Sequence, residues 1–196
     1  MPLETAVAEA VLGGVDWVQL RERDLGGRAL CELAARVVAA ARDAAQRRGG
    51  AVRVLINRRI DVALAVGAHG AHLGFDALPV ALARSLLGPE RLVGVAAHTP
   101  GEVRAAAANG ANYAHLAPIF APLSKPQQRA PLGVAAIEQC GAALPLLAQG
   151  GVEPTNAAAL IRAGAAGVAV TGALLGAADP RAAAQALRAA LDGAMR

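Results

Sequence analysis

Short apolar runs of strand length alternate along the chain with longer stretches in which apolar residues recur at helical spacing. The sequence predicts strands at residues 15–21, 52–57, 70–74, 92–97, 113–118, 145–151 and 167–172. Between them, positions such as Leu30, Leu33 and Val37 repeat every three or four residues, which is typical of a helix that covers a sheet. Strands that alternate with helices form parallel sheets, so the pattern indicates the α/β class.

The first predicted helix, residues 3–12, has no strand before it, whereas every later helix follows one. Seven strands and a leading helix fit a parallel (β/α)8 barrel of the TIM type that lacks its first strand. An open barrel leaves two rows of unpaired backbone groups. Three compensations are consistent with this pattern: pairing with a partner, closure as a seven-stranded barrel, and a coding sequence that begins upstream.

Composition narrows the class of protein further. The 196 residues contain no linker, and we expect one domain over residues 1–196. No apolar run approaches the roughly 20 residues of a membrane span, and the N-terminus lacks a signal pattern, so we expect a cytoplasmic protein without membrane contact. The net charge of +4 comes with only two Phe, one Tyr and one Trp, which argues against nucleic-acid binding. The two cysteines lack metal-site spacing.

Two successive strands near the C-terminus end in small residues just before a helix. Gly150 and Gly151 follow the first strand, and Val170 and Thr171 follow the second. Backbone N–H groups at such turns bind phosphate, and barrels often place a phosphate site after their last two strands. The glycines could also serve only to permit a tight turn. We expect a small phosphorylated substrate at these four residues.

Several motifs occur in an order that resembles the thiamine phosphate synthase and TenI superfamily. They are VQLRER from Val18, LINRRIDVALAVGAHGAHLG from Leu55, VGVAAHT from Val93 and HLAPIFAPLSKP from His115. The resemblance implies phosphorylated pyrimidine and thiazole ligands. In that superfamily the synthase joins a pyrimidine diphosphate to a thiazole phosphate and releases pyrophosphate with the help of Mg²⁺. Some TenI relatives are thiazole tautomerases that need no metal. For such a barrel we expect a homodimer.

The resemblance also implies roles for individual residues. Gln19 and Arg21 match the residues that hold the pyrimidine ring and its diphosphate, and Arg23 stands where lysine is usual. The substrate-binding residues expected from the resemblance are Gln19, Arg21, Arg23, Asn57, Ser124 and Lys125.

Three positions depart from the synthase pattern. Arg58 replaces an aspartate that helps to bind Mg²⁺, and Ala77 replaces the second metal-binding aspartate, which leaves Asp76 alone nearby. Mg²⁺ needs hard oxygen ligands. Ala96 replaces a serine close to the pyrimidine. We therefore expect no metal cofactor, with Mg²⁺ retained only if the protein is a synthase.

These departures favour a metal-independent tautomerase that acts on a thiazole phosphate. The tautomerase histidine is replaced by Pro118, and His115 has the opposite strand parity, so His98 is the expected catalytic acid and base. Two alternatives remain open. One is a synthase that recruits Mg²⁺ through Asp76 and the substrate diphosphate, and the other is a binding protein for a phosphorylated ligand that has lost catalysis.

Overall fold

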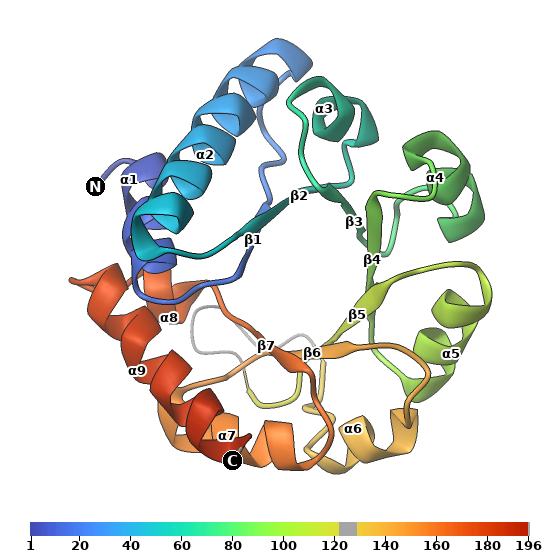
Figure 1. Cartoon of the computed structure of the whole chain (residues 1–196). Coiled ribbons are helices and arrows are strands. Elements are labelled where there is room, and N and C mark those ends of the chain that lie inside the picture. Colours follow the sequence, from blue (N-terminus) through green and yellow to red (C-terminus); the bar gives the residue numbers. More distant parts are fainter. Residues whose placement is uncertain (122–128, 196) are drawn as a thin grey trace.

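A computed structural model describes residues 1–121 and 129–195, and it consists of a curled parallel sheet with helices on its outer face (Figure 1). Each strand pairs in parallel with the next, in the order β1 to β7. The strands are β1 (Trp17–Leu20), β2 (Arg53–Asn57), β3 (Gly70–Leu73), β4 (Leu92–Ala97), β5 (Tyr113–Leu116), β6 (Leu146–Gln149) and β7 (Gly167–Ala169). All seven predicted strands are present, and the predicted TIM-type barrel with one strand missing is confirmed.

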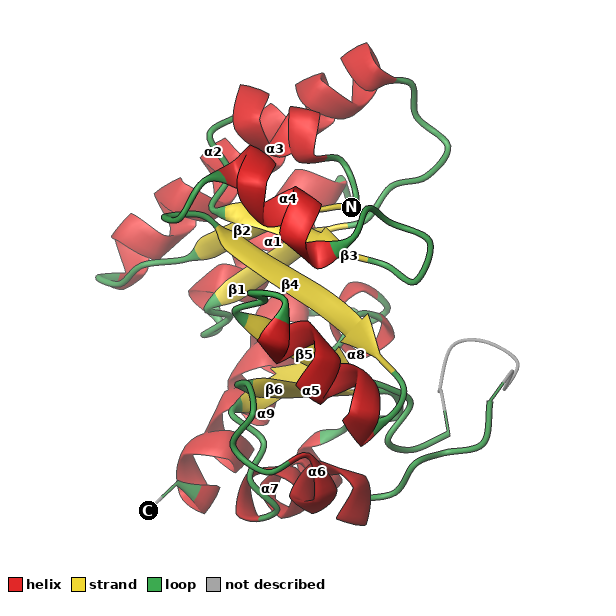
Figure 2. Ribbon diagram, turned by 90° about the vertical axis from the view of Figure 1, so that its right-hand side faces the viewer, coloured by secondary structure: helices red, strands yellow, loops and turns green. Residues whose placement is uncertain are grey.

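The helices occupy the connections between the strands. They are α1 (Leu3–Leu12), α2 (Gly27–Arg48), α3 (Ile60–Ala65), α4 (Val80–Leu87), α5 (Pro100–Ala108), α6 (Ala135–Cys140), α7 (Pro154–Arg162), α8 (Gly172–Leu175) and α9 (Pro180–Ala194). Helices α2 to α4 lie outside the first strands, and α5, α6, α7 and α9 lie outside the later ones (Figures 1 and 2).

Local sequence explains where these helices begin and end. Thr99 Oγ1 accepts a hydrogen bond from the Glu102 N–H at 3.1 Å, and α5 begins with a proline directly after this cap. A side-chain cap followed by proline is a strong helix start, because proline has the φ angle of a helix and lacks the N–H group that would be unpaired there. Helix α2 ends at Gly49, whose φ of +77° suits glycine.

The sheet does not close into a complete barrel. Within the described residues, β1 and β7 are its two edge strands. Closure as a seven-stranded barrel, one of the three compensations considered from the sequence, is therefore not found. Helix α1 packs against both α2 and α9, beside this opening (Figure 1). The leading helix thus links the first and last parts of the chain where the sheet lacks a strand.

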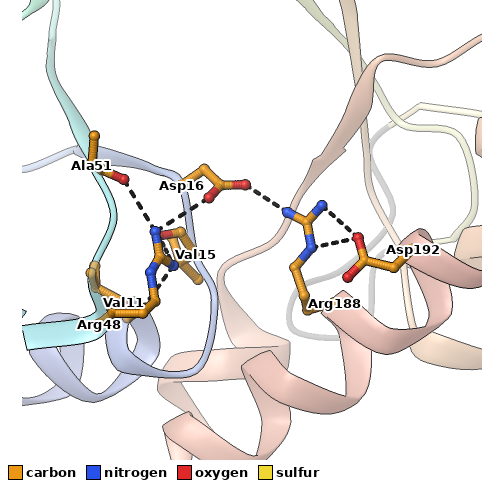
Figure 3. A network of polar contacts seen from close by, with 7 residues as sticks. All are labelled: Val11, Val15, Asp16, Arg48, Ala51, Arg188 and Asp192. Carbon is orange, nitrogen blue, oxygen red and sulfur yellow. Dashed lines mark hydrogen bonds and ion pairs between the residues drawn. The ribbon is translucent and has the colours of Figure 1, made fainter. Parts of the chain in front are cut away.

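An ion-pair network also connects the two sides of the opening, next to the start of β1 (Figure 3). Asp16 lies between two guanidinium groups, with 3.4 Å to Arg48 Nη2 of α2 and 2.6 Å to Arg188 Nη1 of α9. Arg48 Nη1 also donates to the carbonyl oxygens of Val11 and Val15. Because these bonds join α1, α2 and α9, they hold the opening together at the end opposite to the carboxyl ends of the strands.

The buried side chains fall into two main clusters. One cluster lies between α1, α2, β1 and β2, and the other follows β3 to β7 and their helices. None of the described helices has both the length and the apolar character that a membrane crossing requires.

Candidate active site at the carboxyl ends of the strands

Three buried polar side chains occupy the inner face of the sheet. Asn57, His72 and His115 are 6%, 3% and 6% exposed, respectively. The strand register places Asn57 beside His72, His72 beside Gly94, and Gly94 beside Tyr113. The Tyr113 ring fills the space over Gly94, where an added Cβ would lie 2.0 Å from the ring. Glycine at this position therefore lets the tyrosine lie across the barrel interior.

These interior groups contact one another directly. His72 Nδ1 and the Tyr113 hydroxyl share a hydrogen bond of 3.0 Å, and the rings of His72 and His115 lie 4.3 Å apart. The amide of Asn57 donates to the His72 carbonyl oxygen at 3.3 Å. We call His72, Tyr113 and His115 the interior cluster.

Burial keeps the interior cluster uncharged. It lowers the pKa of His72 to about 2, with smaller contributions from the charges of His115 and Arg21. Burial likewise lowers the pKa of His115 to about 4, against a hydrogen bond with Gln149 that raises it, and it raises the pKa of Tyr113. Near neutral pH these groups are therefore uncharged, and the histidines do not act as protonated acids.

A cavity of about 360 Å³ lies beside Tyr113 and His115 and extends along the open edge between β1 and β7 as far as Asp16 and Arg188. Four of the residues expected from the sequence line it together, namely Gln19, Arg21, Val170 and Thr171. Trp17, Tyr113, His115 and Gln149 line it as well. Strand positions as far apart in the chain as Trp17 and Ala169 thus surround one space, whose size suits a small ligand.

Guanidinium groups gather at the carboxyl ends of the first strands. Arg21 directly follows β1, Arg58 directly follows β2, and Arg23 lies two residues beyond Arg21. We call Arg21, Arg23 and Arg58 the arginine cluster. The carboxylate of Asp76, beyond the end of β3, accepts a hydrogen bond from Arg58 Nη1 at 2.7 Å. A hydrogen bond from its own backbone N–H to the carboxylate, and then the charges of Arg58 and Arg23, lower the pKa of Asp76.

The residues present do not fit the Mg²⁺ site that the resemblance implies. The two positions expected to carry metal-binding aspartates hold Arg58 and Ala77, and Asp76 is paired with the arginine. No group of three or more His, Cys, Asp or Glu able to hold a metal occurs among the described residues. A guanidinium next to the remaining carboxylate opposes a divalent cation by charge. The protein's own donor set is therefore unsuited to Mg²⁺.

The two small-residue turns lie side by side on the opposite part of the same face. Gln149 of β6 pairs in register with Ala169 of β7, so Gly150 and Val170 follow at the same level. Gly150 and Gly151 have φ angles of +98° and +61°. An added Cβ would lie 2.9 Å from the Pro118 Cα at Gly150 and 2.4 Å from the Ala121 carbonyl oxygen at Gly151. Both reasons for glycine therefore hold here: unusual backbone conformation and close packing.

The remaining predicted residues have different positions. His98 follows β4, and its Nδ1 donates to the Ala117 carbonyl oxygen at 2.7 Å. It does not line the cavity described above, and neither do Asn57 and Arg23. Ser124 and Lys125, the expected substrate-binding residues of the following loop, lie outside the described residues.

Sequence reasoning did not assign a functional role to Trp17, Tyr113, His115 or Gln149. A usable signal was present, because alternate residues of a strand point to the same face of the sheet. Trp17 therefore lies on the same face as Gln19, and Tyr113 on the same face as His115. Counting back by two from a residue at the carboxyl end of each strand would have identified the side chains that face the interior. What the sequence could not provide was the register that brings the four together.

Comparisons with known proteins agree with this arrangement. The family model described as "Thiamine monophosphate synthase" matches residues 1–174. A thiamine-phosphate synthase from Moorella thermoacetica is 43% identical over 189 residues, which cover 95% of this chain and 87% of that protein. The bifunctional protein ThiM/ThiE from Symbiobacterium thermophilum is 46% identical over 184 residues, 92% of this chain; the chain spans only 37% of that longer protein.

A solved structure has the same fold. Thiamine phosphate pyrophosphorylase from Pyrococcus furiosus superposes with a TM-score of 0.86 at 26% identity, covering 100% of this chain and 92% of that one. These names do not support the expected tautomerase, since the relatives are named as synthases, and Pro118 offers no group for proton transfer at the tautomerase position. Because the family model matches residues 1–174 of the 196, the chain belongs to the thiamine monophosphate synthase family.

Proposed function

We propose that the protein joins a pyrimidine diphosphate to a thiazole phosphate and releases pyrophosphate. The observation that carries this proposal is that two groups of candidate anion-binding residues lie at the carboxyl ends of the strands. The arginine cluster follows β1 and β2, and the glycine turns follow β6 and β7, across the barrel interior from each other (Figure 1). A tautomerase with one phosphorylated substrate needs a single such region, whereas a reaction between two phosphorylated substrates needs both.

The chemistry places one substrate at each region. The diphosphate binds at the arginine cluster, because guanidinium groups bind phosphate through paired N–H donors. The monophosphate binds at the turns of Gly150 and Thr171, where backbone N–H groups are the donors. In this proposal Gln19, Tyr113 and His115, which line the cavity, contact the rings between them. The two reacting carbon and nitrogen atoms are thereby held close, which lowers the entropic part of the barrier.

Bond formation needs no proton transfer in this scheme. The thiazole nitrogen forms a bond to the methylene carbon of the pyrimidine, while the carbon–oxygen bond to the diphosphate breaks and its electron pair leaves with pyrophosphate. Negative charge grows on the leaving group, so positively charged side chains near it lower the barrier. The interior cluster stays neutral and keeps water away from the methylene carbon, which gains positive charge as its bond to oxygen breaks.

The direct test incubates the protein with both substrates across a range of magnesium concentrations and measures thiamine phosphate by mass spectrometry and pyrophosphate release in parallel. We expect equal amounts of the two products, and none when either substrate is omitted. If neither product forms at any magnesium concentration, the proposed function is wrong. Deuterium exchange into a thiazole carboxylate phosphate without pyrophosphate release would instead favour the tautomerase.

The assembly and location of the protein are part of this proposal. We propose a homodimer in the cytoplasm that acts on small phosphorylated metabolites. An exposed apolar stripe formed by Leu78, Leu82 and Leu86 of the α4 segment, together with Leu64 of α3, offers a surface for the second copy. Light scattering of the purified protein measures the mass in solution, and a monomer at all concentrations would contradict the dimer.

A further inference from the structure

Arg58 has an unusual backbone conformation. Its φ is +64°, and it is the one residue other than glycine with a positive φ among the described residues. This left-handed region is unfavourable for long side chains and is more readily adopted by Asn, Asp and Gly. Such strain is found where the surrounding structure or the function requires it. The turn after β2 thus bears a conformational cost while it presents an arginine.

The side chain of Arg58 reaches across to the end of the neighbouring strand. An added Cβ at Gly74 would lie 3.9 Å from both Arg58 Cγ and Cδ, so the arginine passes over the residue that follows β3. Its guanidinium then pairs with Asp76, whose side chain is 60% exposed. A single exposed carboxylate pairs weakly, because water competes for both partners. A ligand with several anionic oxygens can therefore displace Asp76 from Arg58.

Two charged residues next to the arginine cluster have partners outside its guanidinium groups. Arg59, next in the chain, is held by Asp61 at 2.6 Å. The Glu22 carboxylate accepts hydrogen bonds from the backbone N–H groups of Arg23 and Asp24 within its own loop. Glu22, Asp24 and Asp76 place three carboxylates beside the three guanidiniums at the ends of β1, β2 and β3, and only Asp76 is paired with one of these guanidiniums among the described residues. Arg21 and Arg23 have no ion-pair partner in the part of the chain that the structure describes, and together with Arg58 they can bind an anion.

We propose that Arg58 binds the diphosphate of the pyrimidine substrate and supplies the positive charge that the family pattern assigns to Mg²⁺. This inference rests on the proposed function and identifies how its leaving group is stabilised. On binding, the phosphate oxygens replace Asp76 on the Arg58 guanidinium. As the carbon–oxygen bond breaks, the electron pair moves onto the departing pyrophosphate, and Arg58 together with Arg21 and Arg23 neutralises the added charge.

The two partners of the ion pair give opposite predictions, which separates this role from a structural one. In the proposal Arg58 is a ligand and Asp76 is a competitor. Arg58→Gln should weaken anion binding, and Asp76→Asn should strengthen it. If the pair only holds the loop in place, both substitutions should weaken binding. If Asp76 recruits Mg²⁺, Asp76→Asn should weaken binding in the presence of the metal.

The experiment measures binding of inorganic pyrophosphate by calorimetry in the presence of EDTA. We expect the wild-type protein to bind, Arg58→Gln to bind at least about tenfold more weakly, and Asp76→Asn to bind a few times more tightly. The matched control is Arg59→Gln, which removes the neighbouring guanidinium and should change the affinity less than twofold. Thermal unfolding of all three variants checks that each is folded.

Two results would overturn the inference. One is unchanged pyrophosphate affinity in Arg58→Gln, and the other is weaker affinity in both ion-pair variants. Turnover with both substrates is measured on the same samples. Turnover in wild type and in Arg58→Gln alike would refute the role of Arg58 and leave the proposed function standing. Arg58-dependent pyrophosphate binding without turnover under any condition would refute the proposed function and leave the anion site standing.

Discussion

The two anion-binding regions proposed for this barrel differ in the donors that they offer to phosphate. At the ends of β1 and β2 the donors are side chains, namely Arg21, Arg23 and Arg58. At the ends of β6 and β7 the expected donors are backbone N–H groups, and the turn after β6 fits only glycine without collision. A side-chain site can change its charge with a single substitution, whereas a backbone site depends on a conformation. The region that departs from the family pattern is the side-chain region.

The largest effect is expected where a side chain is added to the backbone site. Gly151→Ala places a Cβ 2.4 Å from the Ala121 carbonyl oxygen at a φ of +61°. The turn must move, and a strained residue costs about 1–3 kcal/mol, so we expect roughly 100-fold weaker binding of a thiazole phosphate.

The control for this substitution is Gly67→Ala. Its φ of +63° carries the same conformational cost, but no atom lies within 4 Å of the added Cβ. The Gly67→Ala variant should be less stable than wild type but should bind the thiazole phosphate with unchanged affinity. Equal affinities for the thiazole phosphate in both variants, measured by calorimetry, would show that the turn after β6 does not bind the ligand.

A smaller effect is expected from restoring carboxylates at the arginine cluster. The double variant Arg58→Asp with Ala77→Asp should bind Mg²⁺ about tenfold more tightly than wild type, because two oxygen ligands replace a cation and a methyl group. Its pyrophosphate binding should become dependent on the metal. Calorimetric titration with magnesium chloride measures the Mg²⁺ affinity directly. If the double variant binds Mg²⁺ no more tightly than wild type, positions 58 and 77 are not the metal-binding positions.

The interior cluster between the two regions should make stability depend on pH. The pKa of His115 is about 4 in the folded protein, below the ordinary value of 6.5. The unfolded chain therefore binds more protons, and stability falls as the pH drops from about 6.5 towards 4, by up to about 1.4 kcal/mol per pH unit for this histidine. His72, with its pKa of about 2, adds a further loss.

Urea unfolding at several pH values tests this expectation. His115→Gln should be less stable near neutral pH and show a shallower fall below pH 6.5 than wild type. An identical slope in the two proteins would mean that His115 is protonated inside the folded barrel.

The smallest effect is a difference in salt dependence. Exposed guanidinium groups attract anions over a distance that salt screens, whereas backbone N–H donors act at short range. Raising the salt concentration should weaken pyrophosphate binding several-fold more than thiazole phosphate binding. Parallel titrations of the two ligands in the same buffers measure this. An equal loss of affinity with salt for both ligands would contradict the proposed difference between the two regions.

The sequence was sufficient for the arrangement of elements. Hydrophobic periodicity located the seven strands, and the unpaired leading helix at residues 3–12 correctly indicated an incomplete barrel. Small residues before helices located the turns of Gly150 and Thr171, because such turns follow strand ends in any parallel sheet. These features depend on neighbours in the chain, so local pattern can identify them.

The contacts inside the barrel could not be predicted in the same way. The ring of Tyr113 lies over Gly94 and bonds to His72 only because the strand register places these residues at one level. The pairing of Arg58 with Asp76 joins residues 18 positions apart and depends on the left-handed conformation of Arg58. The sequence therefore indicated which metal-binding aspartates are replaced, and only the structure showed that Arg58 pairs with Asp76 at that position.

The most direct test of the account is a crystal structure of the protein with pyrophosphate and a thiazole phosphate bound together. We predict pyrophosphate on Arg21, Arg23 and Arg58, with Asp76 displaced, and the thiazole phosphate on the backbone of Gly150, Gly151, Val170 and Thr171. Pyrophosphate held through a magnesium ion on Asp76, or both ligands at a single region, would contradict it.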